Sequence, residues 1–342
     1  LTEITIPKNV TAMGTYAFAR CTALTKALIS EGVTTVAGYT FYDCTALREI
    51  TIPESIVSIS GSAFLGCTAM TKINFNATEM KDLTSGNDVF YNAGTAGDGI
   101  EVIIGKNVTK IPAYLFYPSS SSDMVKVISV EFEEGSVCDS IGSYAFAYST
   151  SLKSITLPDS VTAGGTYAFL HSGVEYVTLS RNLTSVSDHC FYYCTELKEI
   201  VLPDSLTAID RYAFYNCSSL TEINIHDSVT TIGTYAFSLC SGFNSVVIPD
   251  SVTVIEDYAF SGTVYYTIYC EAPSKPTTWN TNWKASTIPV VFGILGHGTT
   301  DDGISWVKTS DGTVTVCGYN GNADTVVIPK TIDGANVVGI AS

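Results

Sequence analysis

Residues 220–240 read LTEINIHDSVTTIGTYAFSLC, and the chain returns to this pattern along most of its length. The most constant element of the pattern is a Phe that usually follows Tyr-Ala. It recurs at Phe18, Phe41, Phe64, Phe90, Phe116, Phe146, Phe169, Phe191, Phe214, Phe237 and Phe260. Most of the intervals are 23 residues, and the others lie between 22 and 30. A period of this length predicts a solenoid, in which each repeat forms one coil that packs only on its neighbours.

Each repeat opens with an L-x-x-I-x-I segment that alternates between buried and exposed positions. Period two predicts a short strand with one buried face. A Pro or an Asp-Ser pair then ends the strand, because proline supplies no N–H for a ladder and Asp and Ser favour turns. The later Ala-Phe-x-x-Cys segment fits either half a turn of helix or extended chain. The expected core residues of the quoted repeat are Leu220, Ile223, Ile225, Val229, Ile232, Phe237 and Cys240.

The spacing of the repeats divides the chain into three predicted parts. Residues 1–263 would form the solenoid of eleven repeats, and the stretched repeats at about 70–126 would bulge as loops without breaking the stack. Residues 264–295 would add a strand at 264–270 and a closing segment that contains Trp279 and Trp283. Residues 296–342 would form a hairpin around 310–312 and the truncated start of a second array. Both ends interrupt the pattern, so we expect a monomeric module of a longer protein.

Charge and hydropathy disfavour two classes of partner. The formal net charge is −16, whereas nucleic-acid binding depends on clustered Lys and Arg. The same charge disfavours docking on anionic lipid. No run of 18 apolar residues is present that could cross a membrane. We therefore expect neither a nucleic-acid partner nor membrane insertion.

The ten cysteines favour buried free thiols. Six of them occupy one repeat position, three residues after the Phe: Cys21, Cys44, Cys67, Cys194, Cys217 and Cys240. Other repeats place small residues there: Ala93, Ser119, Ser149 and Ser172. This substitution pattern indicates a packed column in the core. A coil spacing of about 4.8 Å would permit disulfides, but parallel side-chain directions disfavour them, so the redox state stays open.

The consensus L-x-x-I-x-I-P-x-x-V-T-x-I-G-x-Y-A-F-x-x-C at a 23-residue period resembles the BspA-like leucine-rich repeat family. The Y-C-E-A-P…W-N…N-W…V-V-F-G tail and the I-P-x-T-I-D-G restart are also similar to that family. The resemblance implies a right-handed, mainly β leucine-rich-repeat solenoid with a parallel sheet on its concave face. It also implies an extracellular or cell-surface location and a role in adhesion to host or neighbouring-cell surface proteins. The family has no catalytic motif that could be transferred to this chain.

No catalytic, cofactor-binding or metal-binding set is expected. The four His residues share no metal-ligand spacing with one another or with Cys. Asp301-Asp302-Gly303 lacks the further oxygen ligands of a calcium loop, so a solvated turn is favoured. An acidic residue recurs just after the strand, and capping of turn N–H groups is favoured over calcium or ligand binding. This acidic row comprises Glu54, Asp159, Asp204, Asp227 and Asp250.

The outward strand positions remain as the candidate binding surface, on the predicted concave face of the sheet. They are polar, rich in Thr and sparsely aromatic. The candidate residues are Glu49, Lys72, Asn74, Tyr176, Thr178, Glu199, Glu222, Asn224 and His226. A plain solvated β surface explains them as well as a binding surface does. The leading hypothesis is a non-enzymatic protein-interaction module, and the alternatives are a carbohydrate-binding module and a structural spacer.

Overall fold

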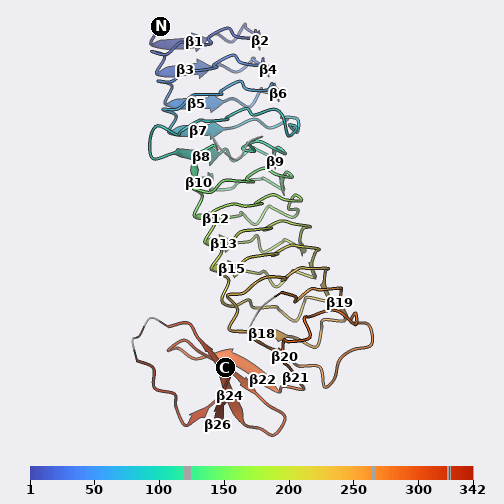
Figure 1. Cartoon of the computed structure of the whole chain (residues 1–342). Helices are drawn as coiled ribbons and strands as arrows, with labels where there is room; N and C mark the ends of the chain where they lie inside the picture. The colour runs from blue at the N-terminus through green and yellow to red at the C-terminus, as the bar shows by residue number, and fades with distance from the viewer. Residues whose placement is uncertain (119–124, 263–265, 322, 324, 342) are drawn as a thin grey trace.

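The computed structural model describes residues 1–118, 125–262, 266–321, 323 and 325–341. Stacked coils run from the N-terminus to about residue 295, and a small separate sheet follows them (Figure 1). Every regular element of the described residues is a β-strand. Pairing between the long strands of successive coils is parallel and in register, so that Glu3 lies beside Lys26 and Lys26 beside Glu49. The predicted mainly β solenoid is confirmed.

The long strands belong to three parallel sheets along one face of the stack. The first sheet contains β1 (Glu3–Ile6), β3 (Lys26–Ile29), β5 (Glu49–Ile52), β7 (Lys72–Phe75), β8 (Ile100–Ile104) and β10 (Val127–Phe132). The second contains β12 (Ser154–Thr156), β13 (Tyr176–Thr178) and β15 (Glu199–Val201). The third contains β18 (Ser245–Ile248), β20 (Thr267–Cys270) and β21 (Val290–Phe292). In the predicted strand at 264–270, residues 264 and 265 lie outside the described part.

A second row of two-residue strands follows the V-T-x-I segments of the repeats. It comprises β2 (Ala12–Met13), β4 (Thr35–Val36), β6 (Ser58–Ile59), β9 (Lys110–Ile111), β11 (Ser140–Ile141), β14 (Ser185–Val186), β16 (Ala208–Ile209), β17 (Thr231–Ile232) and β19 (Val254–Ile255). These strands also pair in parallel with their neighbours, as Ile209 does with Ile232. Successive coils are therefore tied together along two separate lines of backbone hydrogen bonds, each of which is interrupted at some coils.

The Tyr-Ala-Phe segments form successive turns, which settles the choice left open by the sequence. In the repeat quoted above, Ala236 N donates to Gly233 O at 3.1 Å and Ser238 N to Tyr235 O at 3.2 Å. Tyr235 and Leu239 both have left-handed backbone conformations, with φ of 57° and 62°. Such a conformation costs a non-glycine residue roughly 1–2 kcal/mol. Between these residues, Phe237 N donates to the carbonyl of the next coil at 2.8 Å, so the turn also supports the stack.

Phenylalanine and cysteine form two parallel columns inside the stack. Successive Phe rings lie 5.2 to 5.6 Å apart from Phe18 to Phe260. All ten cysteines are free, and all but Cys21 are buried. Five thiols of the column donate to the carbonyl of a Phe in the preceding coil, as Cys240 does to Phe214 at 3.0 Å. Ser119, which shares the cysteine position, lies outside the described residues, as does most of the insertion at 118–123.

Two tryptophans cover the end of the phenylalanine column. The Trp283 ring meets Phe260 edge-on at 5.9 Å, and Trp279 packs on Trp283 at 5.0 Å. Both indoles are buried, and Trp279 Nε1 donates to Val252 O at 2.9 Å. The buried aromatic pair thus replaces the ring that a further coil would supply.

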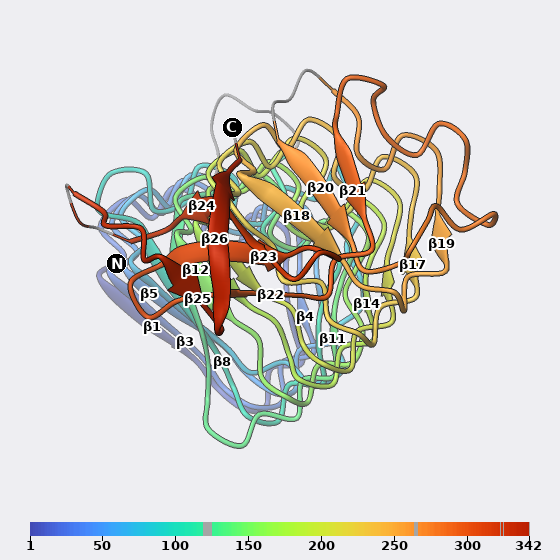
Figure 2. The ribbon, with the colours of Figure 1, turned by 90° about the horizontal axis from the view of Figure 1, so that it is seen from below.

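The last residues form a five-stranded sheet, called here the terminal sheet. It contains β22 (Gly296–Thr299), β23 (Ile304–Lys308), β24 (Val314–Tyr319), β25 (Thr331–Ile332) and β26 (Ala335–Ile340), in the order β22-β23-β24-β26-β25. Strands β23 and β24 make an antiparallel hairpin around residues 309–313. The terminal sheet crosses the stack beside β18 and β20 (Figure 2). Whether this segment begins a second array stays a prediction.

Candidate functional site

The nine candidate residues lie in two groups on the outward face of the long strands, called here the strand face. Glu49, Lys72 and Asn74 lie together on β5 and β7, where Asn74 Nδ2 donates to Glu49 Oε1 at 2.8 Å. The second group begins on β13, beyond the strands β8, β10 and β12. It comprises Tyr176, Thr178, Glu199, Glu222, Asn224 and His226. Lys72, Asn74 and His226 are half-buried and the other six are exposed.

Charges on the first part of the strand face compensate one another. One outward position of successive strands carries, side by side, Glu3, Lys26, Glu49, Lys72 and Glu101. The sign therefore alternates from each strand to the next, at the short spacing of a β-ladder. Opposite charges at this separation attract across the ladder. This part of the face accordingly presents little net charge to a partner.

The second part of the strand face lacks this compensation. Glu175 takes up both nearby lysines, with Lys153 Nζ at 3.1 Å and Lys198 Nζ at 2.7 Å, and their hydrogen bonds lower its pKa. Two arginines of the same coils pair with other carboxylates, at the pairs Arg181–Asp159 and Arg211–Asp188. Within the described residues, Glu199 and Glu222 lie on neighbouring coils and neither forms an ion pair. An uncompensated negative charge therefore remains here.

The coil that contains Glu222 interrupts the ladder of long strands. Residues 222–225 belong to no strand, whereas the corresponding segments before and after them are β15 and β18. In the part of the chain that the structure describes, their backbone N–H and C=O groups bond to no other backbone group. Ile223 and Ile225 still point into the core, where they are 7% and 5% exposed. The interruption thus affects the backbone pairing and leaves the packing of the coil in place.

The terminal sheet covers this interruption and encloses a recess of about 510 Å³, called here the strand-face recess. One wall is the strand face, with Glu199, Val201, Glu222, Asn224 and His226. The opposite wall comes from β22 and β23, with His297, Thr299 and Ser305. Ile223 and Ile225 also line it, although both residues are largely buried. The Asn320 amide, just after β24, donates to the Glu222 carboxylate and links the terminal segment to the strand face.

Sequence reasoning found one wall of the recess and missed the other. Apolar contacts hold the terminal sheet down, since Val307 and Cys317 pack with Tyr269, Val247 and Val291. The last three belong to the outward positions of β18, β20 and β21, which are polar in most other coils. The change from Thr, Glu and Asn to Val and Tyr was the signal that something covers this part of the face.

The two histidines that line the recess, His226 and His297, lie close to polar groups of the stack. His226 places Nε2 at 2.9 Å from Leu202 O and Nδ1 at 3.2 Å from an Asp204 carboxylate oxygen. His297 lies with Nε2 at 3.7 Å from Glu271 Oε1. No group of three His, Cys, Asp or Glu side chains in the described ranges is arranged to hold a metal ion.

The residues of the acidic row interact with other coils, and only some of these interactions are the turn caps that we expected. Asp159 accepts the backbone N–H of Arg181 at 3.2 Å, which is a cap across coils. Asp204 instead faces a His226 side chain, and Glu54 accepts from the Asn107 amide at 2.8 Å. These carboxylates therefore link different coils more than they cap their own turns.

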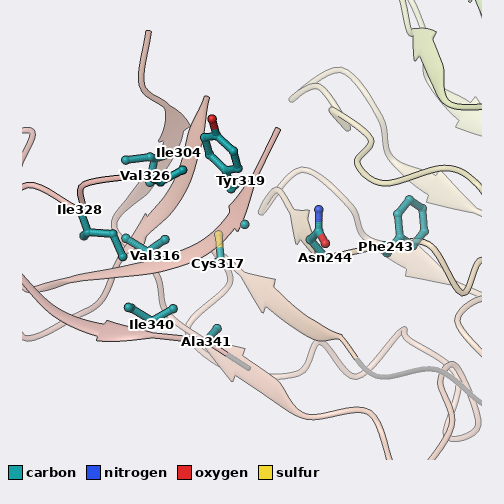
Figure 3. A pocket seen from close by; sticks show the side chains of 11 residues that line it. Phe243, Asn244, Ile304, Val316, Cys317, Tyr319, Val326, Ile328, Ile340 and Ala341 are labelled. Carbon is teal, nitrogen blue, oxygen red and sulfur yellow. The ribbon is translucent and has the colours of Figure 1, made fainter. Parts of the chain in front are cut away.

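A second, apolar cavity of about 370 Å³ lies beside β24 (Figure 3). Its walls come from Phe243 and Asn244 of the stack and from Val316, Ile328 and Ile340 of the terminal segment. The side chains in Figure 3 are mostly aliphatic and converge on the space beside Cys317. This cavity offers hydrophobic contact but few groups that could orient a polar ligand.

The remaining histidines belong to an aromatic ladder along the Tyr-Ala-Phe turns. His189 replaces a tyrosine and packs between Tyr167 at 4.3 Å and Tyr212 at 4.6 Å. Burial lowers the pKa of His189, although the neighbouring Asp188 opposes this shift. The adjacent Cys190 is buried, and burial raises the pKa of its thiol. Both residues thus have the character of packing residues.

The described part of the chain contains no helix that is long and apolar enough to cross a membrane.

Comparison with known proteins identifies the same repeat. The chain matches the model of the BspA type leucine rich repeat region over residues 1–123, 122–242 and 164–282. It is similar to the structure of a leucine-rich repeat protein from Bacteroides ovatus, at 24% identity and a TM-score of 0.52, over 85% of this chain and 84% of that one. It is also similar to the pneumococcal vaccine antigen PcpA, at 19% identity and a TM-score of 0.50, over 88% of this chain and 74% of that one. No curated protein sequence matches the chain.

Proposed function

Because the chain belongs to the BspA-type leucine-rich repeat family, we propose that it is a non-enzymatic interaction module, secreted or displayed at a cell surface. Its partners would be surface proteins of a host or of neighbouring cells. The observation that carries the proposal is the strand face, an extended surface whose exposed side chains are not needed for the core. Tyr176 and Val201 are 49% and 51% exposed there, beside the carboxylate of Glu199. Exposed aromatic and aliphatic groups among polar ones are typical of protein-binding surfaces.

Surface plasmon resonance with the whole chain tests this function. The analytes are a panel of purified extracellular-matrix proteins and bacterial surface proteins, and a glycan array is probed in parallel. Thr178→Arg places a bulky side chain on the strand face, whereas Thr150→Arg makes the same change at an exposed position away from that face. We expect protein binding that Thr178→Arg reduces at least tenfold and Thr150→Arg leaves unchanged.

Three other results would change the proposal. Glycan binding without protein capture would identify a carbohydrate-binding module. Protein capture with equal affinity in both variants would place the binding surface elsewhere. If no protein and no glycan binds, a spacer role becomes the better explanation.

A further inference from the structure

We propose that the strand-face recess binds a lysine or arginine side chain of the protein partner, an inference that rests on the proposed function and specifies its chemistry. The partner would lie along the strand face and insert one basic residue beneath the edge of the terminal sheet. The recess has a volume of about 510 Å³, within the range of roughly 300–1,000 Å³ that is typical of ligand pockets. It is therefore large enough for a whole side chain together with ordered water.

Charge complementarity selects a cation. The two carboxylates of the recess, Glu199 and Glu222, lie on adjacent coils where the first part of the face would alternate Glu with Lys. Lys198 and Lys153 are held by Glu175, at 2.7 and 3.1 Å, and no ion pair of the described residues includes Glu199 or Glu222. A partner cation would supply the missing member of the row, and it would also reduce the repulsion between the two carboxylates.

Beside apolar side chains such as Val201, Val247 and Trp306, the lining of the recess includes hydroxyl groups and backbone carbonyls that can accept hydrogen bonds. Thr299 and Ser305 place their hydroxyl oxygens 3.3 Å apart on the upper wall. Along the strand-face wall, the N–H and carbonyl groups of residues 222–225 make no backbone hydrogen bond within the described chain, so donors as well as acceptors are unused there. Lysine and arginine carry only donors, three and five respectively, and can use such acceptors fully. The recess thus combines negative charge with unused acceptors at the point where the ladder is interrupted.

The neighbouring cavity in Figure 3 provides a contrast. It is lined by Val316, Ile328, Ile340 and Phe243, and a cationic group would lose its hydration there without a carboxylate in return. The two cavities both include Cys317 of β24 in their linings, yet only the strand-face recess suits a charged side chain.

Fluorescence anisotropy with labelled hexa-arginine and hexalysine peptides tests the inference, with a hexaserine peptide as the uncharged probe. An acidic protein attracts cationic peptides over its whole surface, so a matched variant is essential. The recess variant is Glu199→Gln with Glu222→Gln. The control is Glu79→Gln with Asp98→Asn, which removes the same number of charges at exposed positions that do not line the recess. Circular dichroism of each variant confirms that the fold is kept.

We expect the recess variant to bind the basic peptides at least tenfold more weakly, and the control to bind them within twofold of the parent. Raising the salt concentration should weaken parent binding and narrow the difference between the two variants. Equal loss in both variants, or no loss in the recess variant, would overturn the inference. If the partner found by surface plasmon resonance binds the recess variant and the parent equally, the inference fails and the proposed function stands. If no protein binds at all, the proposed function itself fails.

Discussion

Removal of one ring from the phenylalanine column should destabilise the stack by an amount that depends on its position. Phe169 is 2% exposed, and its ring lies 5.5 Å from Phe146 and 5.2 Å from Phe191. Phe169→Ala leaves a cavity between two coils and should cost about 3–5 kcal/mol in the free energy of unfolding. Phe169→Leu keeps most of the apolar volume and loses both ring contacts, each worth roughly 0.5–1.5 kcal/mol. We therefore expect this second variant to cost about 1–3 kcal/mol.

Phe18 supplies the matched control, because it occupies the same repeat position at the first coil. It is half-buried and has a single ring neighbour, Phe41 at 5.4 Å. Phe18→Ala should cost less than half as much as Phe169→Ala. Urea unfolding followed by circular dichroism measures the three variants, and hydrogen exchange shows whether the stack opens locally at the altered coil. Equal costs at the two positions, or an unchanged stability of Phe169→Ala, would refute the reasoning that two-sided packing holds the coils together.

Three further predictions concern the cysteines, the turns and one carboxylate. Burial raises the pKa of Cys194 and Cys240 to about 12. At pH 8 a thiol reagent should therefore label the half-buried Cys21 first and the thiols of the column only after denaturation. Rapid labelling of all ten cysteines in the folded protein would contradict the packing. Tyr212 has a left-handed backbone conformation with φ of 56°, which glycine adopts freely. The free energy of unfolding in urea should therefore be about 1 kcal/mol higher for Tyr212→Gly than for Tyr212→Ala. Equal stability of the two variants would argue against strain at the turn. Hydrogen bonds from Thr313 and then Thr309 lower the pKa of Asp311 to about 2 from an ordinary 3.8. The hairpin should therefore keep this stabilisation above about pH 4 and lose it as the pH falls through 2. Carbon NMR of the Asp311 carboxyl group would follow its titration, and Thr313→Val should raise the pH at which this carboxyl is half-protonated.

Hydrophobic periodicity was sufficient to predict the solenoid, because the positions that repeat are the positions that pack. Ile209 and Ile232 illustrate this, since they occupy the same place in neighbouring coils and lie side by side in adjacent strands. The turn conformation was not predictable in the same way. Tyr235 has a left-handed backbone conformation, which Gly and Asn adopt more often than other residues. Stacking of its ring on Tyr212 at 4.9 Å and on Tyr258 at 5.0 Å offsets the cost of this conformation. Only the register of the coils creates those contacts.

The candidate site was half predictable for a related reason. Outward residues such as Glu199 and Asn224 follow from the strand pattern alone, because period two decides which side chains face out. The opposite wall comes from residues about 100 positions later, such as His297 and Ser305, and no repeat relates the two walls. Contacts between segments so far apart depend on how the terminal sheet docks. Its docking surface, with Val247 and Tyr269, was visible in the sequence only as a loss of polarity.

The coil that best represents the repeat in sequence is also the coil that departs from the ladder in structure. Its core residues, from Leu220 to Phe237, are buried like those of every other regular coil, so packing does not cause the departure. Unpaired backbone groups cost roughly 1–3 kcal/mol each when they are buried without partners. At residues 222–225 they line an open recess instead, where water or a ligand can satisfy them. The regular repeats explain why the chain stacks, whereas the irregular coil that contains Glu222 is where a partner would have both space and uncompensated charge.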